Sequence, residues 1–495
     1  MTFSYQSSAE KFLVGMQAGR DVNKKIKSLI TVAGLVLAAC AYVAIAAPAA
    51  SAATLRTSNV GTDSATCGAS ASPCRSISQA IVNASDGDTI WVGPGHYGDV
   101  NGDGNFTGPG DEQPDPNGGE ANLPDVPLGC IVCITKALHI YSTDGAALTF
   151  IEANASTGSH STVMILHDGG DFGAPDHGFT ITGGNTYGVT IAPYYSGSAF
   201  SVSQDMTIKG NVDIGDGEGF FIQGLGWHQV CPSPFCQFTA RILLASNRAI
   251  NNTTGFDVSP NYWTGRAGQF VLRDNEALGD GTGFIVFPGV QNYPTDDFAA
   301  RNVQLINNIA AHGGTGFYAD VPGLVSYNTA LDNSQSGFTV TPGGAAFNFN
   351  AAISNGGPGV ILNLSNSGPG VILDPADVFS TFSGNNFFGN DRRRTQLFPG
   401  LGLYLSAWNP GPSAHCGVLN LGPMAAIYGP AGTSPVPATQ LQAANNYWGS
   451  SKGPSSSGPG DNAGGVCDQN NSTTITKPFS PTIRGSTVTP LVLEN

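Results

Sequence analysis

Gly255-Phe-Asp-Val-Ser-Pro260 is one of four copies of a short pattern, in which glycine and phenylalanine lead into an alternating strand that ends at a proline. The other copies are Gly283-Phe-Ile-Val-Phe-Pro288, Gly316-Phe-Tyr-Ala-Asp-Val-Pro322 and Gly337-Phe-Thr-Val-Thr-Pro342. An asparagine precedes each glycine by eight or nine residues, at Asn247, Asn275, Asn308 and Asn328. A strand unit that recurs with an asparagine in register predicts a solenoid of stacked coils.

The unequal spacing of the copies indicates one basic coil with insertions. The four glycines are 28, 33 and 21 residues apart, and the excess of seven and twelve lies between the proline and the next apolar strand residue, at Phe270, Val303 and Val325. The basic coil therefore has about 21 residues, and the insertions leave one corner of it. Short strands, asparagines in register and no helical half predict a parallel β-helix, in which stacked asparagines pair with backbone groups at a turn.

Composition agrees with this architecture. The 495 residues include 67 glycines and 32 prolines, which argues against a mostly helical protein. Only 11% of residues are charged and 40% are hydrophobic, so the chain can bury a large core and is not a disordered polyelectrolyte. The net charge of −15 counts against nucleic acid or an anionic membrane as the main partner.

The first residues have the features of a secretory leader. Lys24, Lys25 and Lys27 precede an uncharged run, and small residues follow it. We expect cleavage near Ala52, which divides the chain into a leader (1–52), a β-helix domain (53–485) and a tail (486–495). The secreted protein, expected to be a monomer, would keep 15 basic and 33 acidic residues, a net charge of −18. Two alternatives are lipidation at Cys40, in a lipobox-like Leu37-Ala38-Ala39-Cys40, and a leader retained as a membrane anchor.

Eight cysteines follow the leader, and an even number in an exported chain predicts disulfides. Neighbours in the sequence predict the pairs Cys67–Cys74, Cys231–Cys236 and Cys416–Cys467. The remaining pair is Cys130–Cys133, although residues three apart on a regular strand point to opposite faces.

One helix is expected near the start of the domain. Ser76-Ile-Ser-Gln79 has the form of a capping box, and Ile77, Ala80, Ile81 and Ala84 share one face. We expect Gly87 to end this helix, and the helix to close the amino-terminal end of the solenoid.

Three stretches of the sequence resemble a known group of proteins. Cys67-Gly68…Pro73-Cys74-Arg75-Ser76-Ile77 and Gly87-Asp88-Thr89-Ile90…Pro94-Gly95-His96-Tyr97 resemble the beginning of exported β-helix proteins of the pectin-lyase-like superfamily, and Asn445-Asn446-Tyr447-Trp448-Gly449 is similar to their closing motif. The resemblance covers roughly residues 54–485 and implies an all-β, single-stranded right-handed parallel β-helix with a short N-terminal capping helix. It implies no single chemistry, because the superfamily holds lyases, hydrolases and adhesins.

The two insertions carry the predicted ligand-binding residues. Tyr262, Trp263 and Arg266 lie in the first insertion, and Tyr293 lies in the second. Aromatic rings stack on sugars, and polar side chains bond to hydroxyls or carboxylates. We therefore expect an extracellular polysaccharide or a cell-surface glycan as the partner. The alternative is that these aromatic side chains cover the flank of the solenoid.

The acidic and basic residues of the same loops also allow a catalytic interpretation. Asp296 and Asp297 form a carboxylate pair such as glycoside hydrolysis requires, but the Asn-Thr-Asp and Arg-Ile-Lys motifs of polygalacturonase-like enzymes are missing. A calcium-dependent lyase of the pectate type would use Arg266 as its base and Asp296 and Asp297 as calcium or acid groups. Because the acidic surface repels polyuronates, a non-catalytic binding or surface-interaction role is preferred and the lyase is the alternative.

A separate segment suggests a calcium site. Asp99, Asn101 and Asp103 alternate like the first half of a calcium loop, with Gly104 at the sixth position. Gly110 stands where such a loop has glutamate, although Asp111 or Glu112 could take that role. The alternative is a glycine-rich turn without metal. We predict no cofactor besides calcium.

Overall fold

A computed structural model of the protein divides into two units, Met1–Ser51 and Ala52–Asn495, and the second contains the fold. The structure describes residues 52–101, 103, 108–112, 129–153, 161–184, 186–191, 201–202, 204–223, 237–238, 241–259, 269–286, 303–321, 323–342, 346–362, 381–388, 390, 416–420, 440–442, 445–448, 465–468, 473–475, 477 and 480.

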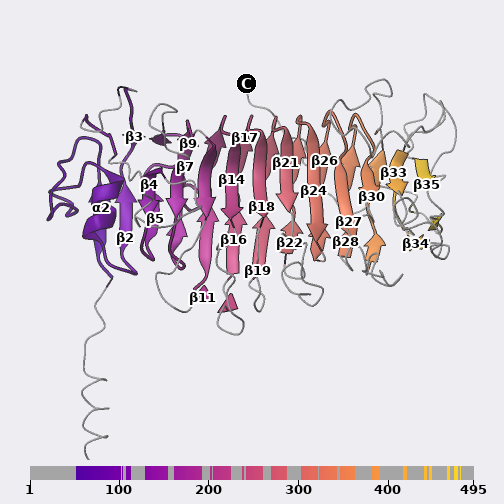
Figure 1. Ribbon diagram of the computed structural model, residues 1–495, viewed down its shortest axis with the longest axis horizontal. Coiled ribbons are helices and arrows are strands. Elements are labelled where there is room, and N and C mark those ends of the chain that lie inside the picture. The colour runs from indigo at the N-terminus through magenta and orange to yellow at the C-terminus, as the bar shows by residue number, and fades with distance from the viewer. Residues whose placement is uncertain are drawn as a thin grey trace, which may run out of the picture. The chain divides into compact units, whose positions relative to one another are not determined.

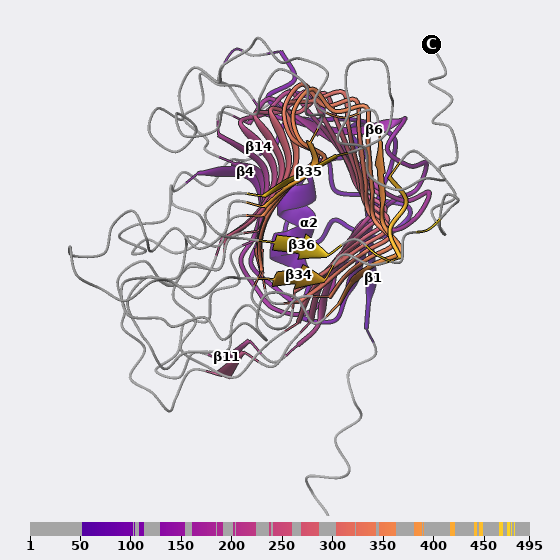
Figure 2. The same ribbon diagram turned by 90° about the vertical axis from the view of Figure 1, so that its right-hand side faces the viewer.

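Three long parallel sheets are built from strands that the chain visits in turn, one strand of each per coil (Figures 1 and 2). Sheet I contains β1 (Thr54–Thr57), β2 (Thr89–Val92), β5 (His139–Ser142), β8 (Asp171–Phe172), β12 (Met206–Lys209), β16 (Arg241–Ala245), β19 (Gln269–Arg273), β22 (Val303–Ile306), β25 (Leu324–Ser326), β28 (Ala346–Asn348) and β31 (Thr381–Ser383). This is the parallel β-helix that the repeats predict.

The other two sheets follow in the same order along the chain. Sheet II contains β3 (Gly95–Gly98), β6 (Thr149–Glu152), β9 (Thr180–Thr182), β13 (Val212–Ile214), β17 (Arg248–Ile250), β20 (Glu276–Leu278), β23 (Ile309–Ala311), β26 (Thr329–Leu331), β29 (Ala351–Ile353) and β32 (Asn386–Phe388). Sheet III contains β4 (Cys130–Ile134), β7 (Ser161–Ile165), β10 (Tyr187–Ile191), β14 (Glu218–Gln223), β18 (Thr254–Ser259), β21 (Thr282–Val286), β24 (Thr315–Val321), β27 (Phe338–Pro342), β30 (Val360–Leu362), β33 (Cys416–Asn420) and β35 (Gly465–Asp468). Two short pairs complete the described strands: β11 (Ser201–Val202) with β15 (Gln237–Phe238), and β34 (Gln440–Gln442) with β36 (Thr473–Ile475).

A ladder of buried asparagines forms the corner between sheets I and II. Each amide group donates to the side-chain oxygen of the asparagine in the next coil, as in Asn275 Nδ2 to Asn308 Oδ1 at 3.0 Å. The ladder contains the four predicted asparagines and continues into further coils. None of its asparagines has exposed surface: Asn211, Asn247, Asn275, Asn308, Asn328, Asn350, Asn385 and Asn446. In the most compact coils the ladder members are 20 and 22 residues apart, which confirms the predicted coil of about 21 residues.

The ladder also holds a strained turn in place. Each residue before a ladder asparagine has a positive φ, including the bulky Tyr327 at 62° and Phe349 at 59°. This left-handed conformation costs a residue with a Cβ roughly 1–2 kcal/mol. The asparagines offset that cost, because their side chains satisfy the backbone groups that the turn leaves unpaired.

The Gly-Phe pairs fill the interior. Phe220, Phe256, Phe284, Phe317 and Phe338 stack coil on coil, with ring centroids 4.7–4.9 Å apart. The preceding glycine is required by close packing against sheet II, since a Cβ on Gly283 would lie 2.7 Å from the Cβ of Ala310. Each Gly-Phe pair thus fills the core with one bulky ring and allows the neighbouring sheet to pack closely against the glycine.

The amino-terminal end is closed by α2 (Ile77–Asn83), as the capping box predicts. Ser76 accepts the N–H of Gln79 at 3.0 Å, and the inward face of the helix is buried. Gly87 has a positive φ of 85° but does not end the helix, which stops at Asn83 with Ala84 in an extended conformation. The amide of Ala84 already bonds to Ala80, so no glycine is needed there.

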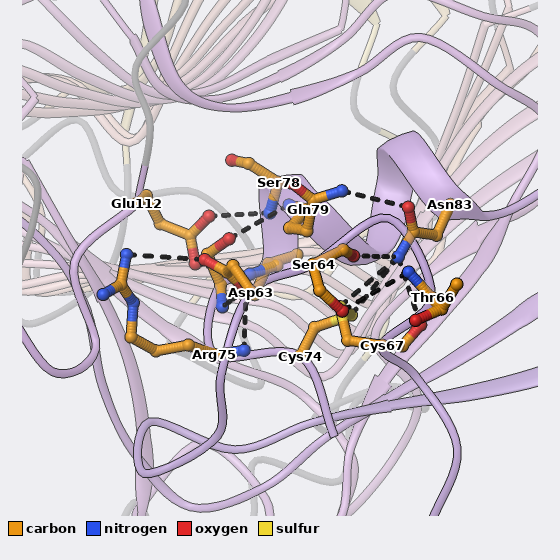
Figure 3. Close-up of a disulfide and its surroundings, with 12 residues drawn as sticks. Asp63, Ser64, Thr66, Cys67, Cys74, Arg75, Ser78, Gln79, Asn83 and Glu112 are labelled. Atoms are coloured by element: carbon orange, nitrogen blue, oxygen red, sulfur yellow. Dashed lines mark hydrogen bonds and ion pairs between the residues drawn. A yellow bond between two sulfur atoms is a disulfide. The ribbon is translucent and has the colours of Figure 1, made fainter. Parts of the chain in front are cut away.

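Glu112 completes this end of the solenoid (Figure 3). Its buried carboxylate accepts the N–H groups of Ile77 at 2.6 Å and Ser78 at 2.7 Å, two donors that the first turn of a helix leaves unpaired. Burial raises the pKa of Glu112 to about 7. Between the ordinary pKa of a glutamate and this value, the folded state holds a proton that the unfolded chain has released, so the stability contributed by this group falls as pH rises.

We expect Glu112→Gln to lower the free energy of unfolding by about 1–3 kcal/mol. Both carboxylate oxygens accept a backbone N–H, so either orientation of the new amide sets its NH₂ group against a donor. Thermal unfolding is the measurement. Glu276→Gln is the matched control, because Glu276 pairs with Arg248 on the surface at 3.0 Å. Equal melting temperatures for the two variants would contradict this role of Glu112.

Two of the predicted disulfides lie in the described residues, Cys67–Cys74 and Cys130–Cys133, and both are formed. The doubt about the second pair is resolved by a bend in β4, where Ile131 and Val132 both face the core, so that Cys130 and Cys133 lie on the same side. Cys231–Cys236 lies outside the described residues. The structure does not describe the side chains of Cys416 on β33 and Cys467 on β35, so that pair stays a prediction.

Candidate functional site

The predicted loop residues all lie outside the described residues. They are Tyr262, Trp263, Arg266, Tyr293, Asp296 and Asp297. The strands place both insertions, however, because one begins after β18 and the other after β21, and each leads to the next strand of sheet I. The insertions therefore start at the carboxyl ends of neighbouring strands of sheet III, at the one corner that their lengths predict.

The predicted calcium segment is described at its three candidate ligands. Asn101 Nδ2 donates to Asp103 Oδ2 at 2.8 Å, and Asn101 Oδ1 accepts the N–H of Asp103 at 3.0 Å. The two residues suggested for the closing position have other roles: Asp111 accepts the N–H groups of Val100 and Gly108, and Glu112 caps α2. Calcium at Asp99, Asn101 and Asp103 stays a prediction.

The structure brings together another group, on the outer face of sheet III. Tyr187 on β10 and Phe221 on β14 stack with ring centroids 4.6 Å apart and planes 10° from parallel. Glu218 is the register partner of Tyr187, and Asp257 on β18 is the register partner of Phe221. All four side chains are half-buried. We call Tyr187, Glu218, Phe221 and Asp257 the outer site.

The same strand bend that joins Cys130 to Cys133 builds this site. Gly219 and Phe220 both turn inward, so the residues on either side of them, Glu218 and Phe221, share the outer face. A regular strand would place these two residues on opposite faces.

The electrostatics of the outer site favour a proton on Glu218. Burial and then the negative charge of Asp257 raise the pKa of Glu218 to about 7. Glu218 Oε2 is buried, and it has no hydrogen-bond partner among the residues that the structure describes. Burial, Glu218 and Asp257 also raise the pKa of the Tyr187 hydroxyl. Such a group of shifted titratable side chains on one face is typical of binding and catalytic sites.

Sequence reasoning missed the outer site, although a signal was present. Gly219-Phe220 is a further copy of the Gly-Phe pair, in the coil before the first quoted copy. Extending the repeat to this copy places Glu218 where the later coils have Thr254, Thr282 and Thr315. A carboxylate at the position where the next three coils have threonine marks this coil as different from them.

The fold and this site define a parallel β-helix protein with an acidic and aromatic outer face. No family model and no curated relative matches the chain. Two solved structures are similar to it, the A-modules of the mannuronan C-5 epimerases AlgE6 and AlgE4 from Azotobacter vinelandii. Each is 12% identical, with a TM-score of 0.39, over 81% of this chain and 93% or 91% of the neighbour.

Proposed function

We propose that the protein binds an extracellular polysaccharide at the outer site. The observation that carries this proposal is the stacked pair Tyr187–Phe221 beside two carboxylates on one half-buried face. The apolar surface of the rings can cover the C–H face of a sugar, and carboxylate oxygens accept hydrogen bonds from sugar hydroxyls. The insertions after β18 and β21 start at the edge of this face, which supports their predicted role in holding the same ligand.

The negative charge of the protein favours a neutral polysaccharide as the ligand. A protein with 35 acidic and 20 basic residues, and with Glu218 and Asp257 in the site, repels a polyuronate unless a cation such as calcium bridges the two.

The location of this activity is proposed to be extracellular. Disulfides persist mainly in oxidising compartments. The protein has two of them in its described residues, Cys67–Cys74 and Cys130–Cys133. The leader-like residues 1–52 support the same location. Among the described residues, no helix has the length and hydrophobicity needed to cross a bilayer.

A calcium-dependent lyase is the second candidate function, and Glu218 specifically favours it. A carboxyl group with a pKa of about 7 can exchange protons at neutral pH. In such a reaction the proton next to the uronate carboxyl passes to the base, the bond to the glycosidic oxygen breaks, and a carbon–carbon double bond remains. The leaving oxygen takes a proton from water, and calcium offsets the charge of substrate and site.

We expect Phe221→Ala to weaken polysaccharide binding at least about tenfold, because removal of one ring opens the stacked surface. The measurement is calorimetric titration with a panel of neutral and uronic polysaccharides, with and without calcium. Tyr327→Asn is the matched control, since it removes an exposed ring that stacks on Phe349 away from the site. Equal loss of binding in both variants, or no loss in either, would contradict the proposal that the polysaccharide binds at the outer site.

Glu218→Gln separates binding from catalysis. If the protein only binds, the variant keeps most of its affinity and no unsaturated product absorbs light in either protein. If Glu218 is a base, product forms faster as pH rises through 7 in the unchanged protein and is lost in the variant, although binding remains. The second result would replace the binding proposal with the lyase.

A further inference from the structure

Five successive coils place an alanine at one position on the inner face of sheet II, and the coil before them places an aspartate there. Ala249, Ala277, Ala310, Ala330 and Ala352 are register partners in successive coils. Asp213 occupies this position one coil earlier, as the register partner of Ala249. It has no exposed surface, and in the described part of the chain neither of its carboxylate oxygens has a hydrogen bond of ordinary geometry. An isolated buried carboxylate is costly, so its charge must be offset or absent.

A second buried carboxyl group lies beside it. The point at which a Cβ would sit on Gly188 is 1.6 Å from Asp213 Oδ2 and 2.9 Å from Asp216 Oδ2. Two carboxylates this close in a buried site cannot both stay ionised without a cation or a proton between them. Asp216 is 4% exposed and lies in the turn between β13 and β14.

The geometry favours a proton over a metal ion. Asp213 occupies the space that a side chain on Gly188 would need, so the backbone of β10 closes the site from one side. Among the described residues, ligand atoms of three His, Cys, Asp or Glu side chains come together only at Asp63, Cys67 and Cys74. Asp213 and its neighbours therefore do not form a cluster of three converging acidic ligands.

The other polar groups around the pair add no positive charge. From the turn before β18, Asn252 accepts the N–H of Asp216 at 2.7 Å, and from the turn before β21, Asp280 accepts the N–H of Asn252 at 2.6 Å. The Asn252 side chain also faces Asp213, and the backbone N–H groups of Gly183 and Gly184 face Asp216. From β10 and β14 the neighbours are Gly188 and Gly219. Burial, and then the charge of Asp216, raise the pKa of Asp213 well above its usual range. Burial also raises the pKa of Asp216 to about 6 and that of Asp280 to about 7.

We propose that Asp213 and Asp216 share a proton inside the solenoid, and that this proton holds together the coil that carries the outer site. Gly188 directly follows Tyr187, and Gly219 directly follows Glu218. The carboxyl group of Asp213 packs against both glycines from inside. When the proton is lost, Asp213 and Asp216 both become negatively charged. These charges then lie against the backbone that positions Tyr187 and Glu218. The link to ligand binding rests on the proposed function, whereas the shared proton does not.

The sign of the pH dependence follows from linkage. Between the ordinary pKa of an aspartate and the raised value, the folded state holds a proton that the unfolded chain has released. The unfolding constant therefore rises about tenfold per pH unit for each such proton. The contribution is fully present at low pH and is lost as pH rises through the raised value.

Asp213→Ala tests the proposal, because alanine is the residue that the next coils have at this position. Denaturant unfolding of the full chain is measured from pH 4 to 8. Between pH 5 and 6 the unfolding constant of the unchanged protein is expected to rise about tenfold more than that of the variant. Asp213→Asn, which keeps the volume, is expected to show the same flattened profile. Asp176→Asn is the control, since Asp176 is exposed and asparagine tolerates its positive φ of 63°.

Equal pH slopes in the unchanged protein and both Asp213 variants would overturn the proposal. A rise in melting temperature with calcium at pH 8, lost in Asp213→Ala, would also overturn it, in favour of a bound cation. Hydrogen exchange supplies the local readout: amides of β10 and β14 are expected to exchange faster at pH 8 than at pH 5, beyond the intrinsic change in rate, and more so than in Asp213→Ala. These results do not depend on polysaccharide binding, so failure of the proposed function leaves them intact.

Discussion

Replacement of Asn275 by alanine is expected to lower the free energy of unfolding by about 3–5 kcal/mol, because it breaks the ladder in the middle of the solenoid. Asn275 Nδ2 donates to the Leu244 carbonyl and to Asn308 Oδ1, both at 3.0 Å. Asn275 Oδ1 accepts the backbone and side-chain N–H groups of Asn247 at 3.0 and 3.2 Å. Alanine leaves all four partner groups buried without this contact.

Denaturant unfolding measures this loss, and two further variants show its cause. Gln304→Ala, on the outer face of the neighbouring coil, is the control and is expected to change stability by less than about 0.5 kcal/mol. Asn275→Asp keeps the shape but replaces the donor to Leu244 by an acceptor, so it is expected to resemble the alanine variant when ionised and to recover at low pH. A stable Asn275→Ala protein would show that the turns do not depend on the ladder.

The repeats predict the fold because stacking in register leaves a direct mark on the sequence. Each asparagine of the ladder bonds to the equivalent asparagine one coil away, so these residues recur at a nearly constant distance from the glycine that follows. Insertions do not blur this signal, because they leave the coil at the corner between sheets III and I, where they change no register. The predicted helix was found for a similar reason, since Ser76 and the apolar face of α2 are local features.

The outer site could not be predicted in the same way. Its residues come from three coils, and the distance between Tyr187, Glu218 and Asp257 along the chain depends on loops of no fixed length. Their common face also depends on the bend at Gly219 and Phe220, which breaks the simple alternation of a strand. The assumption of a regular strand also counted against Cys130–Cys133, which the corresponding bend in β4 allows. A correct prediction needed the knowledge that the Gly-Phe pair puts two consecutive residues inside.

Asp213 shows a further limit of sequence reasoning. On β13 it stands between Val212 and Ile214 in an alternating strand, where an aspartate is expected to face solvent. The register shows the opposite, because Asp213 is aligned with Ile181 of the preceding coil and Ala249 of the next. The local pattern of polarity therefore predicts the wrong face of the strand for Asp213.

Replacement of Phe284 by alanine is expected to lower the free energy of unfolding by about 3–5 kcal/mol. Its ring has no exposed surface and stacks on Phe256 and on Phe317, each at 4.7 Å. The cavity left behind cannot collapse easily, because the strands on both sides are held at a fixed spacing by the sheet and by the ladder. Phe284→Leu is expected to cost less, since it keeps most of the apolar volume.

The measurement is again denaturant unfolding, with Ile285→Ala as the matched control. Ile285 follows Phe284 on β21 but faces outward and is half-buried, so its truncation removes contacts without opening a cavity in the core. Similar losses for Phe284→Ala and Ile285→Ala would mean that the interior relaxes around the missing ring. Because each coil contacts mainly its neighbours, the loss at Phe284 should appear first as faster hydrogen exchange in β18, β21 and β24, before global unfolding. If exchange in these strands stays unchanged although the overall stability is lowered, the phenylalanine stack does not stabilise these coils locally.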